Sequence, residues 1–545
     1  MADRRVSPYT GATMRGARQD PGQLPPLAQA LLRPEFYPHR PAAVKLVQTH
    51  ISYVFLAGDE VYKVKKAVRF AFLDFSTLER RHHFCREEVR LNRRLAPNVY
   101  RGVVAICQRD GGFALAPETA PDAVEYAVHM HRLPADRILT SLLERDQVRP
   151  ELIDAIAARL AAFHAEAAAD PEVARGGDPS VIAALLEDDY SEVDAFHGDT
   201  VSAHDDAAIR QFCRDFLHRH DALLRRRQAA GRIRDGHGDL RAEHICCTNG
   251  LAIFDCVEFN PAFRHRDVAA EIAFLAMDLT SYGRGDLADR LVVRYAQLTD
   301  DRELEGLVPF YACQRAYIRG KVDSLKSGEN DVGAAERAAA RQSAIDHFAL
   351  ALRYTWAQTS CLVVVVGLSG SGKSFLAGAL RARTGFVHIN SDITRKRLVG
   401  VAPTARPGAE LYTSARSAQT YASMYAAAGE ALAAGRGAII DATFQRRVDR
   451  DAARAVAQRA GRPILFVECV CSEEETRRRL AARARRNDDA SDADWAIYRQ
   501  QRARYEPFGP DEAAERIAVD TSRPLDRSLA DVERALRSVA IATEA

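Results

Sequence analysis

Residues 367–374 read GLSGSGKS, and this stretch decides the fold of the chain around it. It fits the pattern G-x-x-x-x-G-K-[ST], it follows the apolar run CLVVVV at 361–366, and FLAGALRAR at 375–383 has the pattern of a helix. Glycines let the backbone N–H groups of such a loop converge on phosphate oxygens, and the start of the following helix adds positive potential. The sequence therefore predicts a strand–loop–helix unit that binds the phosphates of a nucleotide.

Each position of this loop is a candidate for phosphate binding. We expect Lys373 to reach the terminal phosphates and the Ser374 hydroxyl to ligate Mg²⁺. The alternative interpretation is a glycine-rich turn between a strand and a helix that binds nothing. The predicted phosphate-binding residues are Gly367, Leu368, Ser369, Gly370, Ser371, Gly372, Lys373 and Ser374.

Short apolar segments alternate with helical ones on the C-terminal side of the loop. The segments FVHINSD (386–392), GAIIDATF (437–444) and ILFVECV (464–470) read as buried strands. This rhythm predicts a parallel sheet with helices on both faces. We therefore expect residues 360–545 to form an α/β domain with the fold of a P-loop NTPase.

Two carboxylates follow predicted strands of this domain. Asp392 ends the segment FVHINSD, where a carboxylate can accept a proton from the hydroxyl group that attacks a phosphoryl group. Its alternative role is to cap the next helix. Asp441 ends the strand in GAIID and can hold a metal ion or position an acceptor, or it can belong to a strand-end turn.

Arginines crowd the segment 477–486, and two of them, Arg479 and Arg483, are four positions apart on one helical face. Arginines on a closing segment can neutralise the charge that develops as a phosphoryl group moves. The alternative interpretation is a basic helix that faces solvent.

Residues of about 360–545 resemble P-loop kinases of the gluconate kinase, polynucleotide kinase and zeta-toxin type. The resemblance rests on GLSGSGKS, NSD at 390–392, IIDATF at 439–444 and the pair Arg479 and Arg483. No NKxD motif of a guanine-binding protein is present. The resemblance implies that this domain uses ATP.

The N-terminal part of the chain has a different pattern. LVQTHISYVFLAGDEVYKVKK at 46–66 reads as paired strands with a turn at Gly58 and Asp59, and a charged helix is expected from Thr77 to Leu95. Residues 150–350 are mostly helical in pattern, and we expect Arg225, Arg226 and Arg227 to lie on a solvated helix face.

A strand–loop–strand passage at 236–260 carries the second candidate site. It reads GHGDLRAEHICC at 236–247 and IFDCVEF at 253–259, so that Asp239 and Asp255 flank a tight hairpin. Two carboxylates in this arrangement suit phosphoryl transfer, because one can take the acceptor proton while the other holds Mg²⁺. The alternative is a loop with a buried, hydrogen-bonded His–Asp pair.

This spacing, with LAAFHA at 160–165, resembles the aminoglycoside phosphotransferase family, over about residues 40–350. The resemblance implies that residues 26–355 form an α+β, bilobal, protein-kinase-like domain. It also implies that Asp239 is the catalytic base and Asp255 a metal ligand. Lys63, or Lys65 on the same strand face, would then hold the α- and β-phosphates, with Glu88 preferred over Glu87 as the partner carboxylate.

Two features depart from the family pattern. The position of the metal-binding Asn is His244, which can ligate a metal but suits Mg²⁺ less well than an amide oxygen. The loop near Ser52–Asp59 also lacks a glycine-rich run. These departures leave open a low-activity kinase or a pseudokinase, and a pseudokinase-like N-terminal domain could bind a ligand and regulate the other domain.

The composition limits the remaining classes. The 545 residues are 47% hydrophobic and 28% charged, which excludes a disordered or fibrous chain. With 76 Lys and Arg against 74 Asp and Glu, the net charge of +2 argues against nucleic acid and membranes as partners. The 10 cysteines form no CxxC pair and suit a cytoplasmic protein, and residues 1–25 read as a flexible tail without a signal sequence.

The sequence thus predicts a bifunctional phosphotransferase that uses ATP and Mg²⁺ and phosphorylates small hydroxyl-bearing acceptors. The main alternative is a single active C-terminal kinase with a regulatory N-terminal domain. A nucleic-acid end-processing enzyme and an ATP-gated interaction protein are two further alternatives. The sequence names neither the acceptor nor the oligomeric state.

Overall fold

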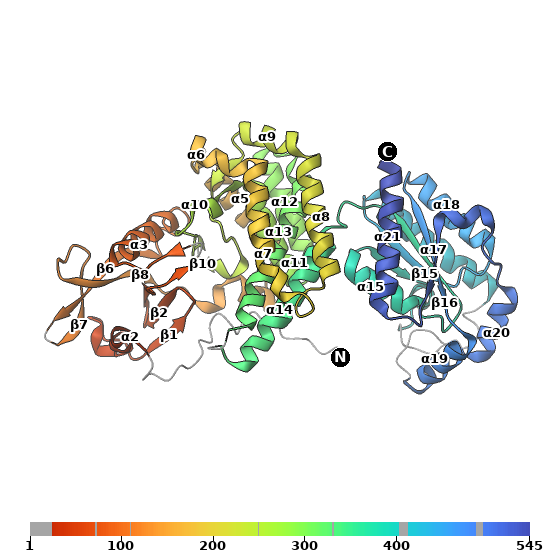
Figure 1. Ribbon diagram of the computed structural model, residues 1–545, viewed down its shortest axis with the longest axis horizontal. Helices are drawn as coiled ribbons and strands as arrows, with labels where there is room; N and C mark the ends of the chain where they lie inside the picture. The colour runs from red at the N-terminus through yellow and green to blue at the C-terminus, as the bar shows by residue number, and fades with distance from the viewer. Residues whose placement is uncertain are drawn as a thin grey trace. The chain divides into compact units, whose positions relative to one another are not determined.

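The computed structural model describes residues 24–70, 73–109, 111–248, 250–329, 332–402, 413–486 and 494–544. The chain divides into two compact units, one that ends at Ala351 and one that begins at Leu352 (Figure 1). Of the predicted tail at 1–25, residues 1–23 lie outside the described part of the chain. Among the residues that were described, no helix combines the length and apolarity needed to cross a bilayer.

The N-terminal unit begins with a six-stranded antiparallel sheet in the order β1-β2-β3-β8-β6-β7. The predicted hairpin is present, and its turn at Gly58 and Asp59 has Gly58 in the left-handed region, with φ of 66°. The strands are β1 (Val44–Gln48), β2 (Ser52–Ala57), β3 (Glu60–Lys65), β6 (Tyr100–Arg109), β7 (Gly112–Pro117) and β8 (Ala123–His131), with a small ribbon of β4 (Arg69–Phe70) and β5 (Leu73–Asp74) beside them.

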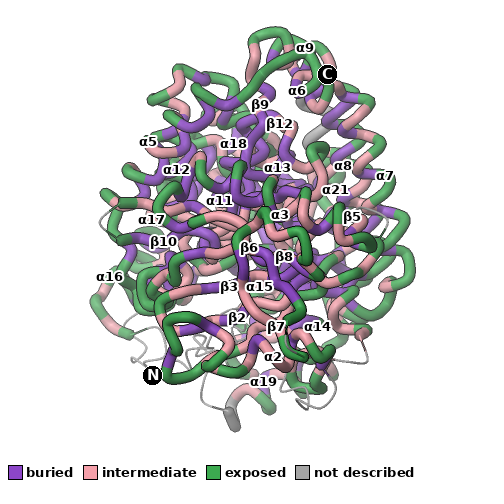
Figure 2. The backbone as a smooth tube through the Cα atoms, turned by 90° about the vertical axis from the view of Figure 1, so that its left-hand side faces the viewer, coloured by how far each residue is buried: buried purple, intermediate pink, exposed green. Residues whose placement is uncertain are grey.

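Both faces of this sheet are covered. Helix α2 (Pro26–Leu31) packs on one face against Phe55, Tyr62 and Val64, and helix α3 (Leu78–Asn92) packs on the other against Val61 and Val128. Strands β3, β6 and β8 are accordingly mostly buried or half-buried in Figure 2. The helix predicted from Thr77 to Leu95 is α3: the Thr77 side chain caps its start, and the helix ends at Asn92, three residues before the predicted Leu95.

The rest of this unit is mostly helical, as predicted, so the unit as a whole is a mixed α/β structure. The helices are α4 (Leu139–Glu144), α5 (Pro150–Glu166), α6 (Pro171–Ala174), α7 (Pro179–Val193), α8 (Ala203–Arg219), α9 (Asp221–Ala229), α10 (Pro261–Arg264), α11 (Val268–Ser281), α12 (Gly285–Thr299), α13 (Leu304–Ser327) and α14 (Ala334–Tyr354). Two short ribbons pair β9 (Ile233–Asp235) with β12 (His265–Asp267) and β10 (Ile245–Thr248) with β11 (Gly250–Ile253). The 3₁₀ turns are η2 (Pro34–Phe36), η3 (Ala135–Arg137), η4 (Arg175–Gly177), η5 (Asp194–Phe196) and η6 (Ala242–His244).

The expectation of a solvated face at Arg225, Arg226 and Arg227 is wrong for the last of these residues. Arg227 is buried, and its guanidinium donates to Asp267 Oδ2 and Asp301 Oδ1, each at 2.7 Å. The carboxylates come from segments distant in the sequence, and they compensate the cost of burying the charge.

The C-terminal unit contains a five-stranded sheet in the order β14-β15-β13-β16-β17, and every pair is parallel. The predicted parallel sheet of a P-loop fold is therefore confirmed, and the structure adds a fifth strand, β17, that the sequence pattern did not indicate. The strands are β13 (Leu362–Val366), β14 (Val387–Asn390), β15 (Ala438–Ala442), β16 (Ile464–Val470) and β17 (Arg516–Asp520).

Helices cover both faces of this sheet, so its central strand is apolar at every position. Leu362, Val364 and Val366 belong to the core under α17 and α18, whereas Val363 and Val365 belong to the core under α15 and α21. Successive strand residues alternate between faces, which explains the continuous run CLVVVV. The helices are α15 (Lys373–Thr384), α16 (Ser391–Leu398), α17 (Ser414–Ala433), α18 (Arg447–Arg459), α19 (Glu473–Arg486), α20 (Trp495–Arg504) and α21 (Leu525–Glu544), with the 3₁₀ turn η8 (Pro510–Glu515).

Candidate active sites

The glycine-rich loop connects β13 to α15 in the C-terminal unit. Gly370 and Gly372 have φ of 82° and 83°, in the left-handed region, and Gly372 stands directly before the first helical residue, Lys373. A Cβ atom at Gly372 would lie only 2.8 Å from Arg479 Nη1. The loop therefore needs glycine here for its left-handed backbone conformation, and the absence of a side chain also lets Arg479 approach closely.

A cavity of about 740 Å³ opens beside the loop, within the range of roughly 300–1,000 Å³ that small-molecule sites occupy. Of the remaining loop residues, Gly367, Ser369 and Ser371 are buried and Leu368 is half-buried. The predicted site residues that line the cavity are Gly370, Gly372, Lys373, Ser374, Asp392, Arg479 and Arg483.

Asp441 lies at the carboxyl end of β15, next to the strand that leads into the loop, and it is completely buried. Asn390 Nδ2 donates to Asp441 Oδ2 at 2.6 Å, and His388 Nε2 lies 3.6 Å from the same oxygen. Within the described ranges, Asp441 Oδ1 has no hydrogen-bond partner. An orphaned carboxylate oxygen at such depth is costly unless a cation compensates it.

The electrostatics of Asp441 favour its charged form. Burial raises the pKa of this carboxyl, but His388, Lys373 and Ser374 together hold it below its usual range. Carboxylate and hydroxyl oxygens are the ligands that Mg²⁺ prefers. Asp441 and Ser374 therefore fit the magnesium site that the sequence predicted.

The cap of helix α16 is Asn390 rather than Asp392. The Asn390 side chain accepts hydrogen bonds from the backbone N–H groups of Asp392 and Ile393, each at 3.0 Å. Asp392 is thus not needed as a cap; its carboxylate accepts from Arg395 Nη1 at 2.9 Å and borders the cavity. Asn390 was missed in the sequence, although an Asn between a strand and a helix is a signal for a cap.

Helix α19 carries the two predicted arginines. Arg479 donates to Glu475 at 2.7 Å, to Thr521 Oγ1 at 2.9 Å and to the Thr521 carbonyl at 2.7 Å, and Arg483 borders the cavity one turn further along the helix. Thr521 in turn donates to the Ser371 carbonyl at 2.6 Å. Thr521, which the sequence analysis missed, therefore ties α19 to the glycine-rich loop.

Helix α20 makes a further contact with the loop. The Ser369 backbone N–H donates to Gln501 Oε1 at 2.9 Å. Backbone N–H groups of such a loop are the groups that bind phosphate oxygens. Gln501 thus occupies one of the donors that a nucleotide can use, and nothing in the sequence pattern indicated this contact.

The second constellation lies in the N-terminal unit, where Lys63 of β3, Glu88 of α3 and Asp255 after β11 meet. Lys63 Nζ lies 2.9 Å from Glu88 Oε1 and 2.7 Å from Asp255 Oδ1. Lys65 is fully buried; it lies 2.8 Å from Glu88 Oε2 and also contacts Glu258. Of the two lysines that the sequence left open, Lys63 is the one that contacts Asp255.

The surroundings of Asp239 are basic. Arg241 donates to both carboxylate oxygens of Asp239, at 2.9 and 2.8 Å, and His244 Nδ1 lies 2.8 Å from the Asp239 carbonyl oxygen. Burial raises the pKa of Asp239, but Arg241 and His244 bring it well below its usual range. His244 Nε2 lies 3.5 Å from Asp255 Oδ2, so this imidazole stands between the two carboxylates.

His237 lies beside this charged group and hydrogen-bonds to the backbone, and its Nδ1 accepts from the Asp239 N–H at 3.3 Å. Its Nε2 lies 2.9 Å from the Phe254 carbonyl oxygen, and burial lowers the pKa of His237 to about 4. Glu271 accepts from the backbone N–H groups of His237 and Gly238, at 2.6 and 2.5 Å. The neutral histidine and the buried glutamate fix the loop that presents Asp239.

Similarity to a known protein family indicates the class of domain to which the C-terminal unit belongs. Residues 362–508 match a family model described as an AAA domain. With the glycine-rich loop at the end of β13 and the parallel sheet, this match makes the C-terminal unit a P-loop nucleotide-binding domain.

The chain belongs to the family of uncharacterized protein Rv2004c from Mycobacterium tuberculosis (strain ATCC 25618 / H37Rv). The two sequences are 31% identical over 498 residues, which cover 90% of this chain and 95% of that protein. Since neither unit alone is that long, the relationship extends over parts of both units.

Two solved structures are similar to part of the chain. A putative kinase from Chloroflexus aurantiacus J-10-fl is 19% identical, covers 33% of this chain and 98% of its own, and has a TM-score of 0.28. A gluconokinase from Sinorhizobium meliloti 1021 is 23% identical, covers 34% of this chain and 94% of its own, and has a TM-score of 0.24.

Proposed function

We propose that the C-terminal unit is an ATP-dependent kinase that transfers the γ-phosphoryl group to a hydroxyl group of a small acceptor. One observation carries the proposal: the buried Asp441 Oδ1 atom lacks a hydrogen-bond partner in the described part of the chain, beside the loop that ends in Lys373 and Ser374. A bound Mg²⁺ would neutralise charge on the phosphates. Ser374 and Asp441 are the residues that would hold it.

The other residues of the site have distinct roles in the phosphoryl transfer. Lys373 and the loop amides hold the phosphates, while Asp392, at the rim of the same cavity, accepts the proton of the attacking hydroxyl. The acceptor oxygen forms a bond to the γ-phosphorus, the bond from this phosphorus to the β,γ-bridging oxygen breaks, and ADP leaves. Arg479 and Arg483 neutralise the charge that shifts during this step.

A second candidate function concerns the N-terminal unit, which we propose to be a further phosphotransferase. The contact of Lys63 with both Glu88 and Asp255 supports it, because a lysine–glutamate pair beside a metal-binding aspartate is the arrangement that protein kinases use to hold ATP. Asp239 would then be the base. The alternative is a regulatory unit, for which His244 at the metal-ligand position is the main argument.

One set of variants tests both proposals. Purified full-length chain with ATP and Mg²⁺ is incubated with a panel of hydroxyl-bearing metabolites and with a 5′-hydroxyl oligonucleotide, and the gain of one phosphate is followed by mass spectrometry. Lys373→Ala and Asp441→Asn should each reduce the transfer by the C-terminal unit at least about 100-fold, because each removes charge stabilisation from its transition state.

The variant Asp239→Asn distinguishes between a second phosphotransferase and a regulatory role for the N-terminal unit. If this unit is a second transferase, Asp239→Asn abolishes one product that Lys373→Ala leaves intact. If it is a regulator, no product depends on Asp239 as a base. Asp188→Asn, an exposed position of α7, serves as the control and should leave all products unchanged. A chain that binds no ATP analogue in the presence of Mg²⁺, or that phosphorylates nothing in the panel, contradicts the proposed function.

A further inference from the structure

A second cavity of about 920 Å³ adjoins the nucleotide cavity in the C-terminal unit. It runs along β14, the terminal strand of the sheet, between α15 and α16. His388, Asn390 and Ile393 line both cavities. The two spaces therefore share a wall at the end of β14, where Asp392 follows.

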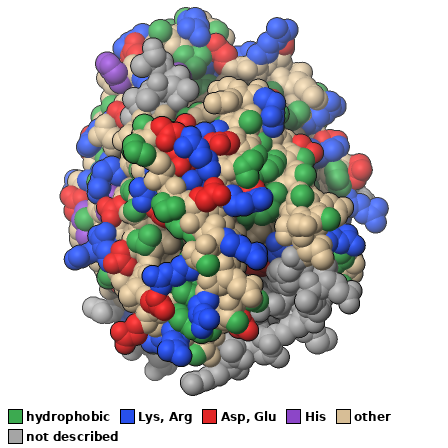
Figure 3. Space-filling view, turned by 90° about the vertical axis from the view of Figure 1, so that its right-hand side faces the viewer, with side chains coloured by type: hydrophobic (Ala, Val, Ile, Leu, Met, Phe, Trp, Pro, Cys, Tyr) green, Lys and Arg blue, Asp and Glu red, His purple; other side chains and the backbone are tan. Residues whose placement is uncertain are grey.

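The lining of this second cavity is basic. Arg353 of α14, Arg381 of α15 and Arg397 of α16 border it, and its described lining contains no aspartate or glutamate. All three side chains are exposed, and within the described ranges none of them makes a hydrogen bond or an ion pair with another residue. On the face drawn in Figure 3, by contrast, basic and acidic side chains are interspersed.

Helix dipoles account for each arginine singly but not for their convergence. Arg353, Arg381 and Arg397 each lie in the last turn of a helix, where a positive charge is favourable. All three are exposed at one cavity that no described carboxylate lines, so an anion from solvent can reach them and form charge-assisted hydrogen bonds with them.

The absence of a side chain at Gly385 also makes room for the Arg353 side chain. Gly385, which follows α15 with φ of 73°, leaves the space that Arg353 fills: a Cβ atom at this position would lie 2.5 Å from Arg353 Nε. A cavity with the volume of a metabolite site, three arginines in its lining and a common wall with the nucleotide site is suited to a small anionic molecule.

We propose that this cavity binds the acceptor of the transferred phosphoryl group, and that the acceptor carries a phosphate or carboxylate group in addition to its hydroxyl. The proposal rests on the proposed kinase function of the C-terminal unit. The arginines hold the anionic group, and the hydroxyl end reaches past His388 and Asn390 towards Asp392 and the nucleotide. The phosphoryl transfer itself proceeds as described above.

Binding is tested on the full-length chain with the loop saturated by AMPPNP and Mg²⁺. Glycerol 3-phosphate, glycerate and glycerol are titrated calorimetrically, because they share hydroxyl groups and differ in their anionic group. At least one of the two anions should bind about tenfold or more tightly than glycerol, since hydrogen bonds to charged groups contribute that much or more. The two anions distinguish a phosphate from a carboxylate as the recognised group.

The variant Arg381→Gln/Arg397→Gln should lose this preference. Arg462→Gln is the matched control, because Arg462 is exposed, borders neither cavity, and its side chain has no hydrogen bond or ion pair with the residues described. Equal binding of glycerol and the anions, absence of anion binding in a chain that binds AMPPNP, or a preference that survives in the double variant overturns the proposal. A chain that does not bind AMPPNP at all contradicts the kinase function itself.

Turnover gives a second, independent readout. In the metabolite panel, products should be confined to anionic acceptors, and the double variant should raise KM for them about tenfold or more while kcat stays close to that of the unmodified chain. Products formed only from neutral or cationic acceptors, or only from the oligonucleotide, overturn the proposal.

Discussion

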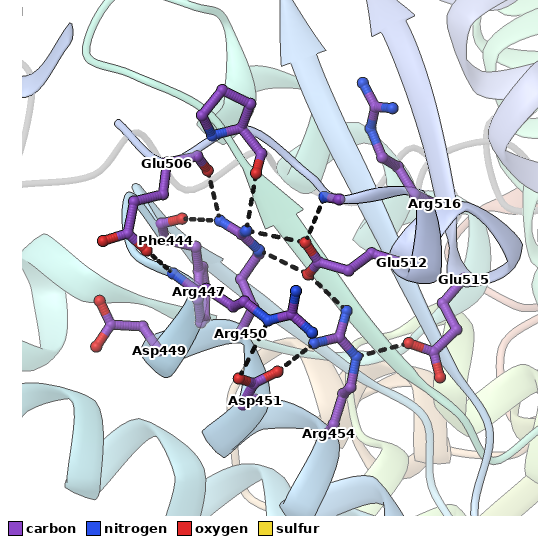
Figure 4. A network of polar contacts seen from close by, with 12 residues as sticks. Phe444, Arg447, Asp449, Arg450, Asp451, Arg454, Glu506, Glu512, Glu515 and Arg516 are labelled. Atoms are coloured by element: carbon purple, nitrogen blue, oxygen red, sulfur yellow. Dashed lines mark hydrogen bonds and ion pairs between the residues drawn. The ribbon is translucent and has the colours of Figure 1, made fainter. Parts of the chain in front are cut away.

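Arg450 shows how a single residue holds the C-terminal unit together. It is fully buried on α18, donates to both carboxylate oxygens of Glu512 at 2.9 and 3.0 Å, and donates to the Glu506 carbonyl at 3.0 Å (Figure 4). Arg454, one turn later, donates to the same glutamate at 2.7 Å. These bonds fix the segment that links α20 to β17.

Replacing Arg450 should destabilise this unit strongly. Arg450→Met leaves Glu512 buried with fewer donors, so we expect the free energy of unfolding to fall by about 3 kcal/mol. The chain has two tryptophans, Trp356 and Trp495, and both lie in the C-terminal unit, so their fluorescence in a denaturant titration reports this change. Arg462→Gln should change the same value by less than about 0.5 kcal/mol.

The destabilisation that Arg450→Met causes should depend on pH in a defined direction. Burial would raise the pKa of Glu512, but the hydrogen bonds from Arg450 and Arg454 lower it from 4.5 to about 2. A carboxyl group with a lowered pKa stabilises the fold fully above pH 4.5, and this contribution disappears as the pH falls towards 2. The difference between the unmodified chain and Arg450→Met should therefore shrink below pH 4.5. A constant difference across this range contradicts the assigned role of the ion pair.

At the scale of elements, the contact of α20 with the glycine-rich loop makes a separate prediction. Gln501 accepts from the Ser369 N–H group, a donor that a nucleotide can use. Gln501→Ala frees this donor, so the Kd for AMPPNP with Mg²⁺ should fall about threefold or more, the value of a typical hydrogen bond. The Kd is measured by calorimetry on the full-length chain.

The control for this prediction is Gln458→Ala on α18, an exposed position whose side chain makes no contact with the loop among the residues described. It should leave the Kd unchanged. If Gln501→Ala instead weakens AMPPNP binding, Gln501 contacts the bound nucleotide rather than competing with it.

The strands of the C-terminal unit differ in how clearly the sequence marks them. Strand β13 is apolar at each of its positions, because both faces are covered, and its pattern was unmistakable. Strand β17, RIAVD at 516–520, has a single buried residue, Val519, and it pairs only with β16 in the described sheet. A half-exposed edge strand has no such run, so only its pairing reveals it.

For the whole molecule, the division into two units predicts two unfolding transitions. Each unit has its own hydrophobic cores, so unfolding of the C-terminal unit by tryptophan fluorescence should not coincide with unfolding of the whole chain by circular dichroism. AMPPNP with Mg²⁺ at 100 times its Kd should stabilise the fluorescence transition by about 2.7 kcal/mol.

The unfolding transition of the N-terminal unit then tests whether that unit binds nucleotide. A shift of the remaining dichroism transition with AMPPNP favours nucleotide binding by that unit as well. A single transition that both probes follow together, and that AMPPNP shifts as a whole, contradicts independent unfolding of the two units.

The sequence by itself determined the glycine-rich loop, the rhythm of strands and helices around it, and the hairpin at Gly58. These follow from local backbone requirements and from periodicity, which neighbouring residues already contain. A family resemblance suggested Lys63, Glu88, Asp239 and Asp255 as candidates and left Lys65 open beside Lys63. The tertiary structure decided which of these groups meet: Lys63 with Asp255, 192 positions away, Arg450 with Glu512, and three arginines of separate helices at one cavity. Such contacts depend on how the chain packs in three dimensions, and no local pattern encodes them.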